Sequence, residues 1–187
     1  MKPLKLQYNA PVVLTFALIS LAALGLGELT NGWTTTKFFC VYRSSLSDPF
    51  TYVRMVCHVL GHSSYAHYIS NILLMLVVGP PLEERYGSRP LFYAILITAL
   101  VSGLVQWFFF PGVALLGASG IVFMMIVMSS LAGMRSGSIP LTLLLVVIFY
   151  LGGEVVNGLF TQDNVSQLTH VIGGVCGAVL GFSMRRR

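Results

Sequence analysis

The chain has 187 residues, of which 56% are apolar and only 9% are charged, and its mean hydropathy is +0.82. A soluble domain carries about 25% charged residues, so the composition excludes an ordinary soluble protein and predicts one embedded in a lipid bilayer. The net charge of +5 comes from basic residues scattered among loops, as membrane topology requires, and predicts no nucleic-acid binding.

Six apolar segments approach the roughly 20 residues that a spanning helix needs. They predict an all-α, polytopic membrane protein whose single domain, residues 1–187, is a six-transmembrane-helix bundle with helices at about 10–27, 64–82, 90–110, 119–134, 139–158 and 167–184. Segment 28–63 is too polar to span. Its mixture of aromatic and basic residues predicts that it lies in the plane of the membrane interface.

The distribution of lysine and arginine predicts the orientation of these helices. If both termini are cytoplasmic, eight basic residues lie inside and three outside, which agrees with the positive-inside rule. The inner residues would be Lys2, Lys5, Arg85, Arg89, Arg135, Arg185, Arg186 and Arg187, and the outer ones Lys37, Arg43 and Arg54. The second, fourth and sixth helices then run from outside to inside.

The fourth and sixth helices are short, and both begin with a polar residue. Ser119 lies 16 residues before Arg135, about 24 Å of helix, whereas the hydrocarbon core is about 30 Å thick. His170 lies 15 residues before Arg185. Both side chains are therefore expected at the same buried depth. Irregular backbone before Ser119 must then be enclosed by protein or line a water-filled cavity, which we expect to open outward.

The sequence Gly117-Ala118-Ser119-Gly120 sets a serine between glycines at the expected start of the fourth helix. A serine hydroxyl becomes a nucleophile when a base lies within hydrogen-bond reach, and free N–H groups at a helix N-terminus stabilise an oxyanion. Gly117 permits an unusual loop conformation, and Gly120 permits a close approach. The motif alone is weak, because Ser119 is equally acceptable as a simple N-cap.

His170 heads a face that is otherwise small, because Gly173, Gly177 and Gly181 follow it at helical spacing. Such a face lets the sixth helix pack closely on a neighbour. If that neighbour is the fourth helix, His170 meets Ser119 and acts as its general base. The alternative is a histidine that bonds a backbone carbonyl between helices.

Four other polar residues near the second helix are candidates for binding. His67 and Asn71 are four residues apart and share a helical face, so they could hold an oxyanion or simply join helices through hydrogen bonds. His58 and His62 have a spacing compatible with zinc, but no glutamate follows His58 as the His-Glu-x-x-His motif requires. We therefore expect no metal and no cofactor.

No acidic residue completes a catalytic triad convincingly. Asp163 lies in the loop before the sixth helix and Glu154 late in the fifth, where solvated loop charges are the simpler interpretation, so a Ser–His dyad is the better hypothesis. Cys40 and Cys57 could both face outward and form a disulfide, whereas Cys176 is most simply a small apolar residue.

These motifs, in this order, resemble the rhomboid family of intramembrane serine proteases. The resemblance extends from about Tyr52 to Gly181. It rests on four stretches of the sequence, namely His62-Ser-Ser-Tyr-Ala-His67-Tyr-Ile-Ser-Asn71, Glu83-Glu84-Arg85-Tyr86-Gly87-Ser88, Gly117-Ala118-Ser119-Gly120, and His170-Val-Ile-Gly173 with Gly177. The second of these stretches is expected to follow the second helix.

The resemblance implies roles for individual residues. Ser119 would be the nucleophile and His170 the base, while His67, Asn71 and the Ser119 backbone N–H would form the oxyanion hole. Arg54 resembles the arginine of a Trp-Arg pair in the family's first loop, and Glu83 and Arg85 would be structural.

Two positions depart from the family's pattern: the tryptophan of the Trp-Arg pair is Val53 here, and a tyrosine often found four residues after the nucleophile is Phe123. Phe123 can still supply a ring face to the base. Neither departure removes the dyad.

The resulting hypothesis is a serine endopeptidase that hydrolyses peptide bonds in or near transmembrane segments of other membrane proteins, in a bacterial inner membrane. The alternatives are a catalytically silent protein that binds membrane clients, and a transporter or channel. A transporter should show paired broken helices, which the sequence lacks. A processing protease for C-terminal sorting signals would keep the same chemistry.

Overall fold

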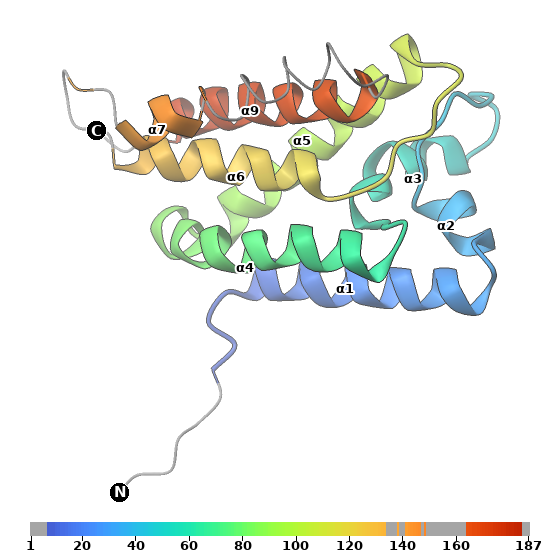
Figure 1. Ribbon diagram of the computed structural model, residues 1–187, viewed down its shortest axis with the longest axis horizontal. Helices are drawn as coiled ribbons and strands as arrows, with labels where there is room; N and C mark the ends of the chain where they lie inside the picture. The colour runs from blue at the N-terminus through green and yellow to red at the C-terminus, as the bar shows by residue number, and fades with distance from the viewer. Residues whose placement is uncertain (1–6, 134–137, 139–140, 147, 149–163, 185–187) are drawn as a thin grey trace, which may run out of the picture.

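The computed structural model describes residues 7–133, 138, 141–146, 148 and 164–184. Its elements are α1 (Pro11–Leu29), α2 (Trp33–Phe38), α3 (Phe50–Cys57), the 3-10 helix η1 (His58–Leu60), α4 (Tyr65–Tyr86), α5 (Ser88–Phe109), α6 (Ser119–Ala132), α7 (Leu141–Val146) and α9 (Asn164–Ser183) (Figure 1). The described residues form no strand, only an isolated bridge between Val41 and Leu115. The all-α prediction is confirmed.

Three helices, α1, α4 and α5, are long and apolar enough to cross a bilayer. The helix α6 has 14 residues, about 21 Å at 1.5 Å per residue, and is as short as its sequence predicted. The predicted fifth span, 139–158, falls largely outside the described residues, which show only α7 within it. Within the described part of the chain the structure therefore supports a helical membrane protein with three helices of spanning length, and the bundle of six spans stays a prediction.

The second predicted helix ends at the wrong place. We expected it to stop at residue 82, but α4 continues to Tyr86, and Gly87, with φ of 90°, terminates it. Glu83 and Arg85 therefore lie in the last helical turn and not after it. Hydropathy marks the end of the apolar stretch, whereas the helix itself persists until a glycine allows the chain to turn.

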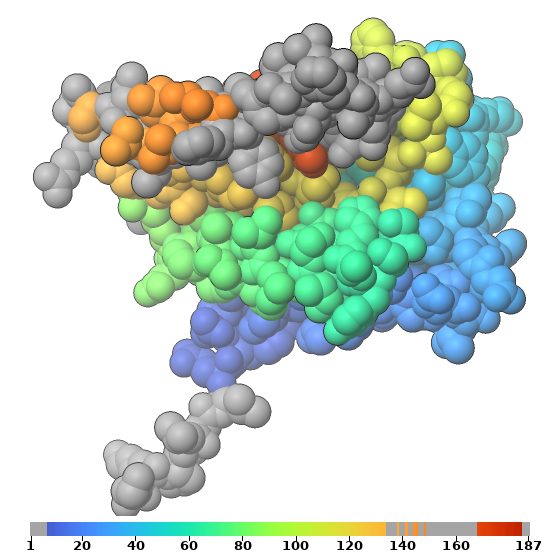
Figure 2. All heavy atoms as spheres, viewed as in Figure 1, coloured from blue at the N-terminus to red at the C-terminus, as the bar shows by residue number. Residues whose placement is uncertain are grey.

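The helices are arranged so that α6 lies at the centre of the molecule. It packs between α4 and α9, and ten of its residues are buried, including Met124, Met125 and Met128. Both α6 and α9 begin at the same end of the molecule, near α2 and α3 (Figure 1). In the space-filling view α4 separates α1 from α6 on the visible face (Figure 2). Ser119 thus starts a helix with ten buried residues out of 14.

The first loop is organised around the buried Arg54, whose side chain is 2% exposed. Its guanidinium donates to Asp48 Oδ2 at 2.7 Å, to Ser44 Oγ at 2.9 Å and to the Lys37 carbonyl at 3.3 Å, and it lies over the Tyr42 ring. The hydrogen bond from Arg54 lowers the pKa of the Asp48 carboxyl. A loop too polar to span the bilayer is thereby given a fixed shape.

Glu83 connects α4 to the start of α1. Its carboxylate accepts hydrogen bonds from the Val12 N–H at 2.9 Å and the Val13 N–H at 3.1 Å. The α1 N-cap, Ala10, offers no side-chain acceptor, so Glu83 satisfies two of the four N–H groups that a helix start leaves unpaired. Arg85, in contrast, is exposed and lies near the Tyr86 ring.

Candidate active site

The irregular backbone before Ser119 is exposed at residues 111–114 and becomes buried only at Gly117 and Ala118, directly before the helix. Val41 and Leu115 exchange two N–H···O bonds of 2.9 Å, and the Gly117 N–H donates to the His58 carbonyl at 3.0 Å. The Gln106 amide donates to the Val113 carbonyl at 2.7 Å. Gln106 was not among the residues predicted from sequence, because its partner lies in a loop.

Ser119 is the first residue of α6, and Ala118 occupies the N-cap position without any side-chain capping bond. The interpretation of Ser119 as a simple N-cap is therefore wrong. The side chain is half-buried, and its hydroxyl makes no hydrogen bond to any described residue. A hydroxyl in this state, at the positive end of a helix with unpaired N–H groups, is open to a reacting group.

The glycine face of α9 packs directly on α6. A Cβ at Gly173 would fall on the Gly120 carbonyl oxygen, and one at Gly177 would meet the Met124 backbone. The Thr169 side chain in turn contacts Gly120. Residues later in α9 contact residues later in α6, so the two helices run in parallel. The sequence predicted this relative direction. This register brings residue 170 to the level of the first turn of α6.

The imidazole of His170 stacks on the Phe123 ring, with the ring centroids 4.6 Å apart and an interplanar angle of 15°. Phe123 lies one turn after Ser119 on the same face of α6. The structure therefore brings His170 beside the predicted nucleophile, although the two side chains make no hydrogen bond to each other. Such bonds are often long before substrate binds.

His67 contacts the loop before the nucleophile. A Cβ at Gly117, whose φ is 127°, would lie 2.9 Å from His67 Cε1 and 3.0 Å from Nε2. On the other side of the ring, Nδ1 lies 3.1 Å from Ser63 Oγ and accepts the Ser63 N–H at 3.5 Å. An accepting Nδ1 leaves the proton on Nε2, which faces Gly117. Ser63 was missed from sequence.

Asn71 is buried one turn after His67 on the same face of α4. Its side-chain amide donates to the His67 carbonyl at 3.2 Å. The amide has two hydrogens, so this bond orients the group and leaves one donor over. The structure thus places His67 and Asn71 on one face, with His67 against the Gly117 loop.

The two histidines weighed as zinc ligands are engaged elsewhere. His58 Nδ1 lies 3.2 Å from the Arg54 carbonyl and Nε2 lies 3.2 Å from Ser102 Oγ, while His62 Nδ1 lies 3.2 Å from the Leu60 carbonyl. Burial lowers the pKa of both rings to about 4. Among the described residues no three His, Cys, Asp or Glu side chains form a potential metal site.

The remaining candidates are resolved only in part. Asp163 and Glu154 lie outside the described residues. Cys40, Cys57 and Cys176 are free thiols, so the disulfide considered for the first two is absent. Burial raises the pKa of both the Cys40 and the Cys57 thiol, which keeps them protonated and unreactive near neutral pH.

Comparison with known proteins places this arrangement in a family. The model of the rhomboid domain matches residues 49–187. The chain belongs to the rhomboid family. It is 27% identical to the mouse rhomboid-related protein 2 over 196 residues, covering 93% of this chain and 65% of the relative. It is 31% identical to the rhomboid protease GlpG of Serratia proteamaculans over 135 residues, covering 69% of this chain and 47% of the relative.

A third relative is the rhomboid-like protein 15 of Arabidopsis thaliana, which is 27% identical over 179 residues, covering 83% of this chain and 41% of the relative. This rhomboid chain therefore spans between 41% and 65% of the length of these three relatives. The matches agree on a helical membrane protein of the rhomboid type.

Proposed function

We propose that this rhomboid is an intramembrane serine endopeptidase in which Ser119 and His170 form a catalytic dyad. The observation that carries the proposal is the setting of Ser119: a half-buried hydroxyl, bonded to no described residue, at the first residue of a buried apolar helix. Polar groups at such a depth are costly and usually functional. The parallel packing of α9 then supplies an imidazole at the same level, held by its stacking on Phe123.

In the proposed reaction, His170 accepts the proton of Ser119 as the hydroxyl attacks the peptide carbonyl. The oxyanion is stabilised by the Ser119 N–H, by the Nε2–H of His67 and by the second amide hydrogen of Asn71. The protonated His170 then donates its proton to the leaving amine. Water, activated by the same imidazole, hydrolyses the acyl-enzyme.

The depth of the site suggests the class of substrate. A carbonyl can reach Ser119 only if a transmembrane segment of another protein enters between helices and unwinds locally. Small or helix-breaking residues near the cleaved bond favour such unwinding. The lysine and arginine count supports cytoplasmic termini and a site that opens outward. The relatives come from a bacterium, a plant and a mammal and so do not select one membrane.

The test is cleavage of a transmembrane substrate in liposomes by the wild type and by variants. Ser119→Ala and His170→Ala should each lower the rate by about a thousandfold or more. Ser130→Ala is the matched control on the same helix, because within the described part of the chain the Ser130 hydroxyl bonds only the Ile126 carbonyl. This variant should cleave like the wild type. Equal cleavage by Ser119→Ala would refute the proposal.

Binding of membrane clients without cleavage is the second candidate. It would use the same packing of α9 on α6 without an activated serine. A protein of this kind would retain a transmembrane substrate equally well in the wild type and in Ser119→Ala, and neither would release a product.

A further inference from the structure

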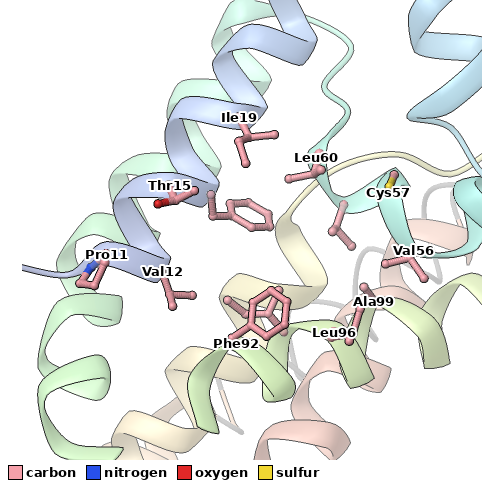
Figure 3. A pocket seen from close by; sticks show the side chains of 13 residues that line it. Pro11, Val12, Thr15, Ile19, Val56, Cys57, Leu60, Phe92, Leu96 and Ala99 are labelled. Carbon is pink, nitrogen blue, oxygen red and sulfur yellow. The ribbon is translucent and has the colours of Figure 1, made fainter. Parts of the chain in front are cut away.

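A second feature of the molecule is an apolar pocket of about 370 Å³ that lies away from Ser119. Side chains from α1, α5 and the α3–η1 segment converge on it (Figure 3). Its buried floor includes Phe16, Ile95 and Ala99, whereas Ile19 and Phe92 at its rim are each about half exposed. Thr15 and Cys57 provide the only polar side-chain atoms of the lining, so the pocket offers almost nothing to water.

The position of the pocket exposes it to lipid on one side of the membrane. Its walls α1 and α5 are both candidate spans, and both start at the same end of the molecule (Figure 1). The lining residues of α5 extend from 92 to 99, about 10 Å of helix compared with about 15 Å for one leaflet's hydrocarbon. The Met55 backbone packs on Gly103 of α5, so the lining residues of the α3–η1 segment close the pocket within the length of α5. With α1 and α5 spanning the bilayer, the mouth faces acyl chains of the half of the membrane in which both helices begin.

A positive charge lies one helical turn before the first pocket residue of α5. Arg89 precedes Phe92 by three residues and Leu96 by seven, so the three share one face of α5. Arg89 is exposed and makes no ion pair with any described residue. Arg85 and Arg89 outnumber the exposed Glu84 at this end. A guanidinium here suits a phosphate group.

We propose that this pocket binds one acyl chain of an anionic phospholipid, with the phosphate of the headgroup at Arg89. The volume lies within the roughly 300 to 1,000 Å³ of typical ligand sites, whereas a helix of another protein, about 10–12 Å across, is too wide. A dry apolar pocket takes an apolar guest and not water. The lipid would join α1, α5 and the first loop. No lining residue comes from α4, α6 or α9, so this site is independent of the proposed chemistry at Ser119.

The first test maps where lipid touches the protein. Wild-type protein in vesicles receives phosphatidylglycerol with a photoactivatable diazirine at the end of one acyl chain, and crosslinked peptides are identified by mass spectrometry. Crosslinks should concentrate on residues 56–60 and exceed those on Leu73 and Val77, which are exposed apolar residues of α4. Crosslinks spread evenly over all exposed apolar faces would overturn the proposal, as would occupation by a protein segment.

The second test uses adjacent residues of α5. Leu96 lines the pocket, whereas Ile97 does not and is exposed. Leu96→Trp should fill the pocket and reduce crosslinking to residues 56–60 by about tenfold, while Ile97→Trp should change it by less than about twofold. Equal effects of the two substitutions would contradict a specific site.

The headgroup is tested by competition between unlabelled lipids. Phosphatidylglycerol should displace the probe about fivefold better than phosphatidylcholine in the wild type. Arg89→Gln should abolish this preference, and Arg89→Lys, which keeps the charge, should retain most of it. A preference that survives in Arg89→Gln would place the phosphate elsewhere and overturn that part of the proposal.

Discussion

At the residue scale, the polar side chains of the site differ in how they are satisfied. His67 is held through Ser63, and Asn71 bonds the His67 carbonyl. Ser119 has no such partner among the described residues. In the proposed dyad this open hydroxyl is the group that reacts with the substrate.

Gly117 provides a test of the loop that carries Ser119. Alanine at this position would have to adopt φ of 127° and place its Cβ within about 3 Å of the His67 ring. We expect Gly117→Ala to lower activity by at least about a hundredfold through displacement of His67 and to destabilise the fold by about 1–3 kcal/mol. Substrate cleavage and thermal unfolding in detergent measure the two effects.

Gly133→Ala is the control for this substitution. Gly133, just after α6, has an ordinary φ of −83° and no atom within 4 Å of its Cβ position. It should leave both activity and stability close to the wild type. If Gly117→Ala behaves like Gly133→Ala, the contact between this loop and His67 is not needed.

The sequence predicted the site residues that obey helical spacing. Ser119 with Phe123, and His67 with Asn71, are four residues apart, so their shared faces follow from periodicity alone. Ser63, Ser102 and Gln106 were missed. The contact between His58 and Ser102 joins residues 44 positions apart, and periodicity within one helix contains no information about such a pair.

At the scale of the elements, the contact between α6 and α9 depends on individual glycines. A Cβ at Gly173 would overlap the Gly120 carbonyl oxygen, whereas one at Gly174 would meet only Val127 at 3.9 Å. We expect Gly173→Ala to separate the helices, cost about 2–4 kcal/mol and reduce activity sharply. Gly174→Ala should be neutral or stabilise α9 by about 0.5–1 kcal/mol. Thermal unfolding of both variants measures the difference, and equal stability would contradict the packing.

Glu83 tests the connection between α4 and α1. Glu83→Gln replaces one accepting oxygen with an N–H₂ group that faces a backbone N–H, so we expect a loss of about 1–3 kcal/mol. The neighbouring Glu84 is exposed, and Glu84→Gln should change stability by less than about 0.5 kcal/mol. Chemical or thermal unfolding in detergent compares the two, and similar values would show that the bonds to Val12 and Val13 contribute little.

The ends of the elements were predicted less well than their existence. From hydropathy we predicted that the second helix ends at residue 82, whereas α4 ends at Tyr86 in the structure. The missing information was a tertiary contact. Glu83 ends the apolar stretch in the sequence, but it is buried in the structure because it accepts hydrogen bonds from α1. The start of α6 at Ser119 was predicted correctly, since Gly117 provides a local signal.

At the scale of the whole molecule, stability should depend on pH through the buried histidines His58 and His62. Burial lowers the pKa of each from 6.5 to about 4. A neutral imidazole whose pKa is lower in the folded state than in the unfolded state contributes its full stability to the fold above the unfolded pKa of 6.5. This contribution is lost as the pH falls from 6.5 towards the folded pKa of about 4. At pH 5 the loss should be about 2 kcal/mol for each histidine.

Thermal unfolding in detergent at pH 7.5 and pH 5 measures this effect. The wild type should have a markedly lower Tm at pH 5. His58→Gln cannot titrate and should show a smaller difference between the two values of pH. The Asp48 carboxyl does not interfere, because its pKa is held below 3.8. A Tm that does not change between these conditions would show that both rings are accessible to protons in the folded state.

The architecture of the whole molecule was predicted at the level of class and of the relative direction of α6 and α9. Composition identified a helical membrane protein, and the lengths of the short helices predicted that Ser119 and His170 lie at the same level of two parallel helices; α9 itself begins earlier than expected, at Asn164. The shape of the first loop could not be predicted. It follows from the burial of Arg54, whose contacts with Lys37, Ser44 and Asp48 depend on a fold that brings these residues together.

The most direct test of the proposed dyad is labelling of the purified wild type, Ser119→Ala and His170→Ala with a fluorophosphonate probe, which reacts only with an activated serine. A working dyad predicts labelling of the wild type and loss of labelling in both variants, each folded as judged by its thermal unfolding. Absence of labelling in the folded wild type, or undiminished labelling of Ser119→Ala, would contradict it.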